Sequence, residues 1–436
     1  MKMKMLHKRI LIISFSYRPL NNPRAFRWTH LSEEIVAAGY TVDVVTSWVP
    51  GCPDTEYIGN LSIHRAGWKF LERLRGRRRL AREQAGKVEI LKAPSLLLKA
   101  SRAVLKGVNW LWRSLYWPDP SCLWFFPARQ MALALVAQNK YDVVISVAPT
   151  FTAVAVGHSV HKRVVDAVWL LDLGDPFSFL EGAPPNNTVL YGWLNRWYER
   201  KVFSQADVIS VTNPQTQQRY AEDFPESATK LLVIPPLLSL PKSGAKSTVP
   251  GRLVYIGTMY RNIREPGFLL ELFRRALKAD LSHDTELHCY GDVSSCLDII
   301  AGYAPLLGKR VFFHGVVSRE VAAQALDEAH FLINIGNETT YQLPSKVVEY
   351  AATGKPVINL AKSRMDSSVG FFAAYPCALN MINSMPLPDE VAVDEFVSFI
   401  KGTPPAMERT ALTEWLSPYT PKNVVAAYLN AMNSKY

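Results

Sequence analysis

The chain has 436 residues, of which 48% are hydrophobic and 20% are charged. This length predicts two or three domains, and the composition is that of a chain that buries hydrophobic cores, which excludes disorder and a collagen-like structure. Five scattered cysteines offer neither a disulfide framework nor a CxxC zinc site, so we expect a protein of the reducing cytoplasm. The apolar run at residues 9–15 is too short to span a membrane and is expected to form the first buried strand.

The net charge of +11 comes from one stretch of the chain. Residues 65–113 contain fourteen Lys or Arg and three Glu, and aromatic residues, five of them tryptophans, accompany them up to residue 126. Nucleic-acid-binding proteins usually spread their basic residues over a larger footprint, whereas Lys and Arg beside Trp are typical of a membrane interface. We therefore expect residues 65–126 to contact an anionic membrane surface, and we expect no nucleic acid partner. The alternative is a solvated basic helix beside an aromatic core.

Short apolar runs alternate with amphipathic stretches along the chain, a pattern that predicts parallel βαβ units. In the first half, a helix is expected at residues 25–38, and strands are expected at residues 9–16, 41–46, 141–147, 164–171, 207–212 and 231–234. In the second half, strands are expected at residues 253–256, 286–290, 311–314, 331–335 and 356–360, and helices at residues 267–279, 319–328, 345–352 and 421–433.

This pattern divides the chain into two doubly wound α/β domains. Residues 1–235 are expected to form the first domain and residues 252–410 the second, and the proline-rich residues 236–251 have the composition of a linker. Residues 411–436 are expected to form a terminal helix that packs back towards the first domain. Doubly wound sheets bind ligands at the carboxyl ends of their strands, so we expect the ligand in the cleft between the two domains.

The strongest local signal is the run at residues 342–358. Pro344 and Ser345 are good helix starters, with Ser345 expected as the N-cap. A helix start that follows a strand is suited to bind an anion such as phosphate, and Lys346 would add a positive charge. Glu349 lies one turn further on, where a carboxylate can accept both hydroxyls of a ribose next to that phosphate. The alternative is an ordinary capped helix with a solvated Glu and Lys.

This run resembles the donor-binding motif of retaining GT-B glycosyltransferases of the family 4 type, in the branch that makes bacterial exopolysaccharides and lipopolysaccharides. The resemblance implies a GT-B fold and transfer of a sugar from a nucleotide sugar to a hydroxyl, with retention and without a metal or a further cofactor. It implies a lipid-linked or oligosaccharide acceptor, reached by an enzyme at the inner face of the membrane. It also implies that Glu349 holds the ribose and that Leu343, Pro344, Ser345 and Lys346 line the donor site.

The chain departs from the family pattern at one position of this motif. Many members carry a second Glu eight residues before the ribose Glu, where this chain has Tyr341. The alternatives for contact with the transferred sugar are Glu338 and the backbone amides of residues 339–343.

Two further segments resemble donor-side loops of the family. Gly257 ends an expected strand, and Arg261 and Arg264 follow it as candidates to bind the diphosphate and to stabilise the charge that develops as it leaves. The alternative is a basic surface loop. The second segment, which contains His314 and Val316, resembles the part of the family that lies against the nucleobase. The alternative for His314 is a buried structural histidine.

Gly291 ends another strand that is expected to face the donor.

The first domain resembles the family more loosely. Asp175 is the best candidate for an acceptor-side carboxylate, and Arg24 and Arg27 are candidates to bind phosphate in a first loop that lacks glycine. The alternative for Asp175 is a capped turn. His158 and His161 lack a third metal ligand nearby and are expected at the surface.

Three other functions fit part of the pattern. A GT-B phosphorylase or sugar-nucleotide epimerase would share the donor motif. A non-catalytic GT-B subunit that binds a polysaccharide-assembly partner would explain Tyr341. A nucleic-acid binder would use residues 65–113, but no base-stacking platform or recognition motif accompanies the charge.

Overall fold

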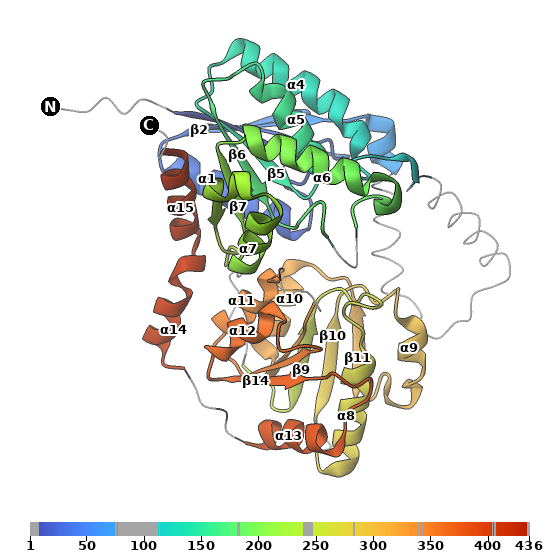
Figure 1. Ribbon diagram of the computed structural model, residues 1–436. Coiled ribbons are helices and arrows are strands. Elements are labelled where there is room, and N and C mark those ends of the chain that lie inside the picture. The colour runs from blue at the N-terminus through green and yellow to red at the C-terminus, as the bar shows by residue number, and fades with distance from the viewer. Residues whose placement is uncertain are drawn as a thin grey trace. The chain divides into compact units, whose positions relative to one another are not determined.

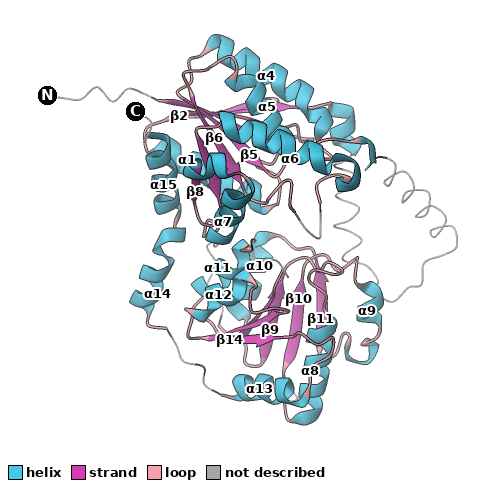
Figure 2. Ribbon diagram, in the orientation of Figure 1, coloured by secondary structure: helices cyan, strands magenta, loops and turns pink. Residues whose placement is uncertain are grey.

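The computed structural model of the chain describes residues 8–74, 76, 112, 114–180, 184–238, 247–281, 284–337, 341, 343–402, 404 and 407–433. The described residues fall into two compact units (Figure 1). Of the described residues, unit 1 contains those up to Leu237 and those from Thr420 onward, and unit 2 contains those between Leu238 and Tyr419. Each unit has a parallel sheet with helices on both faces (Figure 2), which confirms the expected fold class.

Unit 1 is built on an eight-stranded sheet with the order β3-β4-β2-β1-β5-β6-β7-β8. All neighbouring strands are parallel except the pair β3 and β4 at one edge. The strands are β1 (Arg9–Ser14), β2 (Thr41–Ser47), β3 (Thr55–Ile58), β4 (Leu61–Ala66), β5 (Val143–Ala148), β6 (Val168–Leu173), β7 (Val208–Val211) and β8 (Leu231–Val233).

The alternation of side chains along the strands gives unit 1 two separate cores. Leu11 and Ile13 of β1 lie in one core, whereas Ile10 and Ile12 lie in the other. The first core is covered by α4 (Phe125–Gln138), α5 (Phe151–His161), α6 (Thr188–Gln205) and α7 (Pro214–Asp223). The second core is covered by α1 (Pro23–Ala37) and α15 (Pro421–Asn433). The C-terminal helix therefore belongs to unit 1, where it packs beside α1 (Figure 1).

Asp172, near the end of β6, fixes α15 and α1 to the sheet. Its carboxylate accepts hydrogen bonds from Trp28 Nε1 at 2.7 Å and from Tyr428 Oη at 2.7 Å, and it pairs with Arg24 Nη1 at 2.9 Å. Burial alone would raise the pKa of Asp172, but Arg24, Arg27 and the donated hydrogen bonds outweigh it and hold the pKa below its ordinary value. The ionised carboxylate therefore stabilises the fold at neutral pH, and this contribution is lost as the pH falls through that lowered pKa.

Unit 2 is built on a six-stranded parallel sheet with the order β11-β10-β9-β12-β13-β14. The strands are β9 (Arg252–Ile256), β10 (Glu286–Tyr290), β11 (Val311–Gly315), β12 (Phe331–Ile335), β13 (Val357–Ala361) and β14 (Ala378–Ile382). The order reverses between β9 and β12, which places a topological switch point at the carboxyl ends of these two strands.

The two faces of this sheet are also covered by different helices. One core contains Tyr255 and is covered by α8 (Gly267–Ala279), α9 (Leu297–Ala301) and α13 (Glu390–Lys401). The other contains Val254 and is covered by α10 (Arg319–Glu328), α11 (Ser345–Ala352), α12 (Ser367–Ala373) and α14 (Arg409–Leu416).

All of the expected strands and helices are present, and six of them (β10, β12, α8, α10, α11 and α15) have the expected bounds. The helix expected at residues 25–38 begins earlier, at Pro23, because the side chain of Asn22 accepts a hydrogen bond from Ala25 N and caps it. The expected domain bounds and the linker at residues 236–251 stay predictions.

We predict that Asp172→Asn lowers the free energy of unfolding by about 3–5 kcal/mol at pH 7, because it removes a buried carboxylate that pairs with the half-buried Arg24. Urea denaturation followed by circular dichroism measures this loss. Asp166→Asn, at an exposed position before the same strand, is the matched control and should cost less than about 0.5 kcal/mol. Equal stabilities of the two variants would contradict the role given to Asp172.

Candidate functional site

Two neighbouring strands of unit 2 end at glycines that bring their backbones into contact. Gly257 follows β9 with φ +152°, and Gly291 follows β10 with φ +134°. A Cβ atom on Gly291 would lie 2.2 Å from the carbonyl oxygen of Gly257, so a larger residue cannot occupy this position without a backbone shift. The two glycines leave the carboxyl edge of the sheet, next to the switch point, open to close approach by a ligand.

The helix α11 begins beside this edge without a side-chain cap. The structure places Pro344 at the N-cap, with φ −64° and ψ 133°, and Ser345 is the first helical residue. The expectation that Ser345 is the N-cap is therefore wrong, because the extended backbone needed at a cap is supplied by the proline. The Pro344 cap has no side chain that can bond the first N–H groups of α11, and among the described residues no side-chain cap is present, so the positive end of the helix dipole faces this edge of the sheet.

Lys346 places its ammonium group inside this site. The Nζ atom is buried, lies 4.5 Å from the centre of the Tyr255 ring, and would be 3.3 Å from a Cβ atom on Gly257. Among the residues that the structure describes, none forms a hydrogen bond with this atom. Burial, followed by the charge of Arg264, holds the pKa of Lys346 well below its ordinary value, and the charge of Asp366 opposes this shift. Burial disfavours the ammonium form, so a bound anion would stabilise the protonated lysine.

Of the two candidate arginines, Arg264 lies at the site. Its Nε donates a hydrogen bond to Asn337 Oδ1 at 2.5 Å, and Asn337 follows the end of β12. Asn262, with φ +67°, turns the loop so that Arg264 returns to the sheet edge. Arg261 points elsewhere: its guanidinium is exposed and pairs with Asp298 on α9.

Glu349 faces Arg319, the first residue of α10. The Arg319 Nη2 and Glu349 Oε1 atoms lie 3.6 Å apart, and the glutamate side chain retains 23% of its exposure. Burial of its carboxyl group raises the pKa of Glu349 to about 7, although Arg319 opposes this shift. The carboxylate is therefore poised to accept hydrogen bonds from a ligand, and its charge depends on pH in the physiological range.

His314 lies in a stack of rings on the outer strands β10 and β11. Its ring is 4.2 Å from that of Tyr290 and 5.2 Å from that of His288, nearly parallel to both. The His314 Nε2 and His288 Nδ1 atoms are 3.0 Å apart and share one hydrogen bond. Burial, followed by the charges of His288 and Arg252, lowers the pKa of His314, so its imidazole is neutral at pH 7. Val316 follows the end of β11 and is half-buried.

The structure thus assembles most of the expected donor-side residues at one edge of unit 2. Gly257, Gly291, Lys346 and Arg264 lie around the switch point, and the half-buried residues 343–345 lead into α11. Tyr341 is buried, and Glu338 lies outside the described residues. Asn337 and Arg319 were not among the expected site residues. Asn337 lies in the loop after β12, and Arg319 begins the helix that follows β11. Their position at the carboxyl ends of strands is the signal that could have found them.

The residues expected on the acceptor side lie in unit 1. Asp175 follows β6 and is half-buried. Arg24 is not a free phosphate ligand, because it is bound to Asp172, and Arg27 donates to the Pro235 carbonyl at 2.8 Å and to Tyr428 Oη at 2.9 Å.

The expectation that His158 is a surface residue is wrong. The ring of His158 is buried, lies parallel to that of Trp169, and has Tyr198 Oη and Gln205 Oε1 each at 3.0 Å. An apolar helix, α5, holds it against the sheet, so its polar atoms are satisfied inside the protein. His161 of the same helix is half-buried.

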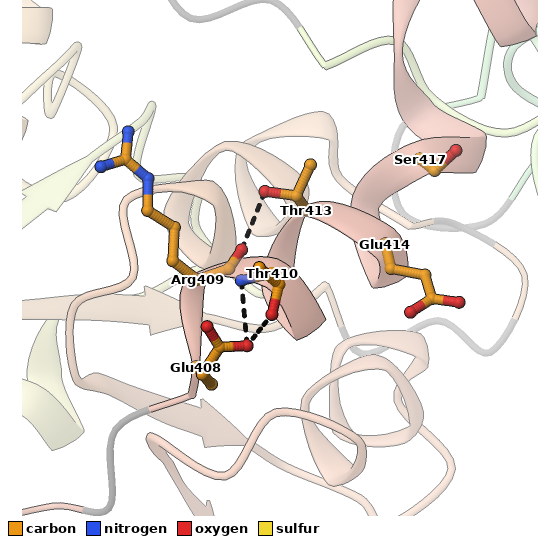
Figure 3. Close-up of a pocket in the computed structure, with 6 residues that line it drawn as sticks. All are labelled: Glu408, Arg409, Thr410, Thr413, Glu414 and Ser417. Carbon is orange, nitrogen blue, oxygen red and sulfur yellow. Dashed lines mark hydrogen bonds between the residues drawn. The ribbon is translucent and has the colours of Figure 1, made fainter.

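A groove of about 700 Å³ runs along α14 (Figure 3). Its lining contains the carboxylates Glu408 and Glu414 and one cation, Arg409. Glu408 caps α14 through Thr410 N and Ala411 N. The groove contains none of the strand-end residues, and its balance of charge does not suit an anion, so we do not assign the site to it. In the described part of the chain, no group of three or more His, Cys, Asp or Glu could hold a metal ion.

Two family models match the chain. The model of the Glycosyl transferase 4-like domain matches residues 25–236, and the model of Glycosyl transferases group 1 matches residues 250–369. The second match contains every donor-side residue described above, from Gly257 to Glu349. No curated protein matches the chain. The chain therefore contains both domains of a glycosyltransferase.

Solved structures share this architecture over the whole chain at low sequence identity. The crystal structure of TarM has a TM-score of 0.61 at 10% identity and covers 99% of each chain. A Staphylococcus aureus TarM mutant in complex with fondaparinux, alpha-GlcNAc-glycerol and UDP has a TM-score of 0.60 at 11% identity, over 98% of this chain and 100% of that one. The α,α-trehalose 6-phosphate synthase of Burkholderia multivorans has a TM-score of 0.58 at 10% identity, over 98% of each chain. At these identities the likeness shows the fold, which is GT-B.

We predict that Lys346→Met weakens binding of a nucleoside diphosphate about 10- to 100-fold while leaving nucleoside affinity unchanged, because only the diphosphate compensates the ammonium. Isothermal calorimetry with each ligand measures the two affinities. Lys309→Met, at an exposed position before the amino end of β11, is the matched control. Equal losses for the nucleoside and the diphosphate would show that Lys346 supports the fold instead.

Glu349 should make ligand affinity depend on pH. If its ionised carboxylate accepts the ribose hydroxyls, affinity falls below its pKa of about 7, by up to about tenfold per pH unit. Glu349→Gln, which cannot titrate, should remove this part of the dependence while Lys346 stays in place. Calorimetric titrations of the wild-type protein and of Glu349→Gln at pH 6 and at pH 8 measure the two pH dependences. If affinity changes with pH to the same extent in both proteins, the Glu349 carboxylate does not take part in binding.

Proposed function

We propose that this chain, a glycosyltransferase of the GT-B fold, moves a sugar from a nucleotide-sugar donor to a hydroxyl of a lipid-linked or oligosaccharide acceptor, with retention at the anomeric carbon. The observation that carries the donor assignment is the buried ammonium of Lys346 without a hydrogen-bond partner among the described residues. A diphosphate bound there would accept hydrogen bonds from Lys346, Arg264 and the start of α11. The ribose would then lie within reach of Glu349, one turn further along the same helix.

In the reaction that we propose, the bond between the anomeric carbon and the diphosphate oxygen breaks as the bond to the acceptor oxygen forms on the same face. The proton of the acceptor hydroxyl passes to the departing phosphate oxygen. Lys346 and Arg264 stabilise the negative charge that grows on the diphosphate, which is why the proposed reaction requires no metal ion. This mechanism rests on the resemblance to family 4 enzymes and on the cationic site.

The acceptor is proposed to be part of surface polysaccharide biosynthesis. Two structural relatives are consistent with this role: a TarM complex contains alpha-GlcNAc-glycerol and UDP, and WaaB is described as a lipopolysaccharide outer core galactosyltransferase. We propose that Asp175 contacts the acceptor. We further propose that residues 65–126, with their eleven excess positive charges between 65 and 113, hold the enzyme at the cytoplasmic face of an anionic membrane. Much of this segment lies outside the described residues, and no described helix is long and apolar enough to cross a membrane.

A sugar-nucleotide epimerase is the second candidate. A putative UDP-N-acetylglucosamine 2-epimerase from Listeria monocytogenes shares the fold, with a TM-score of 0.54 at 13% identity over 98% of this chain and 96% of that one. Incubation with a donor alone separates the two functions, since an epimerase turns over without an acceptor.

Transfer assays on arginine variants test the proposed chemistry. We predict that Arg264→Met lowers kcat about 100-fold, because the residue faces the leaving diphosphate. Arg261→Met, in the same loop, should lower it less than about fivefold, because its exposed pair with Asp298 contributes little. The assay follows label from a panel of nucleotide sugars into membrane lipid and oligosaccharide fractions. Equal effects of the two variants, or turnover of the donor without any acceptor, would contradict the proposal.

A further inference from the structure

We propose that the exposed apolar face of α6 inserts into the interface of an anionic membrane and anchors unit 1 there. This inference rests on the proposed function and deepens it, because it names an anchoring element outside residues 65–126. A basic segment alone gives electrostatic attraction, whereas stable attachment also needs apolar side chains that enter the lipid interface.

Large apolar side chains of α6 form one stripe. Val189, Trp193 and Trp197 follow one another at intervals of four residues, so they lie on the same face of the helix. Their side chains are 92%, 72% and 52% exposed, and Leu190 beside them is 51% exposed. The opposite face, with Val202 and Phe203, packs into the core of unit 1. Exposed apolar surface of this kind is typical of an interaction site.

The charges of α6 fit a negatively charged lipid surface. Lys201 continues the stripe by one more turn, and its Nζ lies 4.9 Å from the centre of the Trp197 ring. Glu199, the one acidic residue in the sequence of α6, is buried on the opposite side and accepts a hydrogen bond from Tyr220 Oη at 2.8 Å. The exposed face therefore presents apolar and basic groups without a competing carboxylate of its own, as interfacial helices do.

Residues that follow the basic segment in the sequence contact α6 where the stripe begins. Tyr191 Oη donates a hydrogen bond to the Ser114 carbonyl at 3.1 Å. Trp117 Nε1 donates a hydrogen bond to Asn195 Oδ1 at 2.9 Å, on the same helix. Between these two contacts, Leu115 is 63% exposed and extends the apolar surface. The apolar stripe therefore lies next to the residues at which the chain leaves the basic segment.

Vesicle co-sedimentation of the full chain tests this inference. The wild-type protein should bind vesicles of phosphatidylcholine and phosphatidylglycerol but not vesicles of phosphatidylcholine alone. Trp193→Ser/Trp197→Ser should weaken binding at least about tenfold, as expected for two apolar side chains that are no longer buried. Trp193→Phe/Trp197→Phe should retain it. Tyr57→Ser/Val165→Ser is the matched control. The side chains at these positions are 73% and 72% exposed but lie outside α6, so the double variant should bind vesicles as the wild type does.

Three results would overturn the inference. The first is that the wild-type protein does not bind anionic vesicles, and the second is that the serine double variant binds them as well as the wild type does. The third is a dimer in light scattering that the serine double variant abolishes, which would assign the stripe to a second copy of the chain. Donor affinity of each variant, measured by calorimetry without lipid, should remain unchanged, so failure of the membrane anchor is distinguishable from failure of the proposed transfer.

Discussion

The proposed donor site depends on one electrostatic constraint: the buried Nζ of Lys346 has no hydrogen-bond partner among the described residues. Gly257 and Gly291 let the strand ends pack closely, the Tyr255 ring lies 4.5 Å from this nitrogen, and the start of α11 adds a further positive potential. A buried positive charge is unfavourable without an anion to compensate it. We propose that the diphosphate supplies that compensation, so that this interaction contributes to affinity and to transition-state stabilisation.

Two buried carboxylates of unit 1 are compensated within the fold. Asp172 contacts Arg24, Trp28 and Tyr428, and Asp43 contacts Arg9 and His64. These interactions stabilise the unit and occupy the charges that take part in them. The contrast with Lys346 is the physical reason why we propose the anionic donor on unit 2 and seek the acceptor among the half-buried groups of unit 1.

The sequence allowed much of the fold to be predicted, because parallel strands buried on both faces are short apolar runs and their helices are amphipathic. The strands β3, β4 and β14 were missed. The edge strand β3 has two exposed residues, Tyr57 and Ile58, so it lacks the apolar run that identifies the buried strands. The residues proposed for the donor site were identified by resemblance, but their roles were not separable. Arg261 and Arg264 are equivalent in the sequence, whereas in the structure Arg264 bonds Asn337 and Arg261 pairs with Asp298, with the turn at Asn262 between them.

The central claim is that the strand ends of unit 2 bind a nucleotide sugar through its diphosphate. Differential scanning calorimetry of the full chain with UDP-, GDP-, ADP- and TDP-sugars tests it most directly. At about 100 times the dissociation constant, the correct donor adds about 2.7 kcal/mol to the free energy of unfolding and raises the midpoint of unit 2. We predict that one nucleobase gives this shift and that Lys346→Met abolishes it. The account would be contradicted if no nucleotide sugar changed the unfolding midpoint. It would also be contradicted if the shift of the midpoint persisted in Lys346→Met.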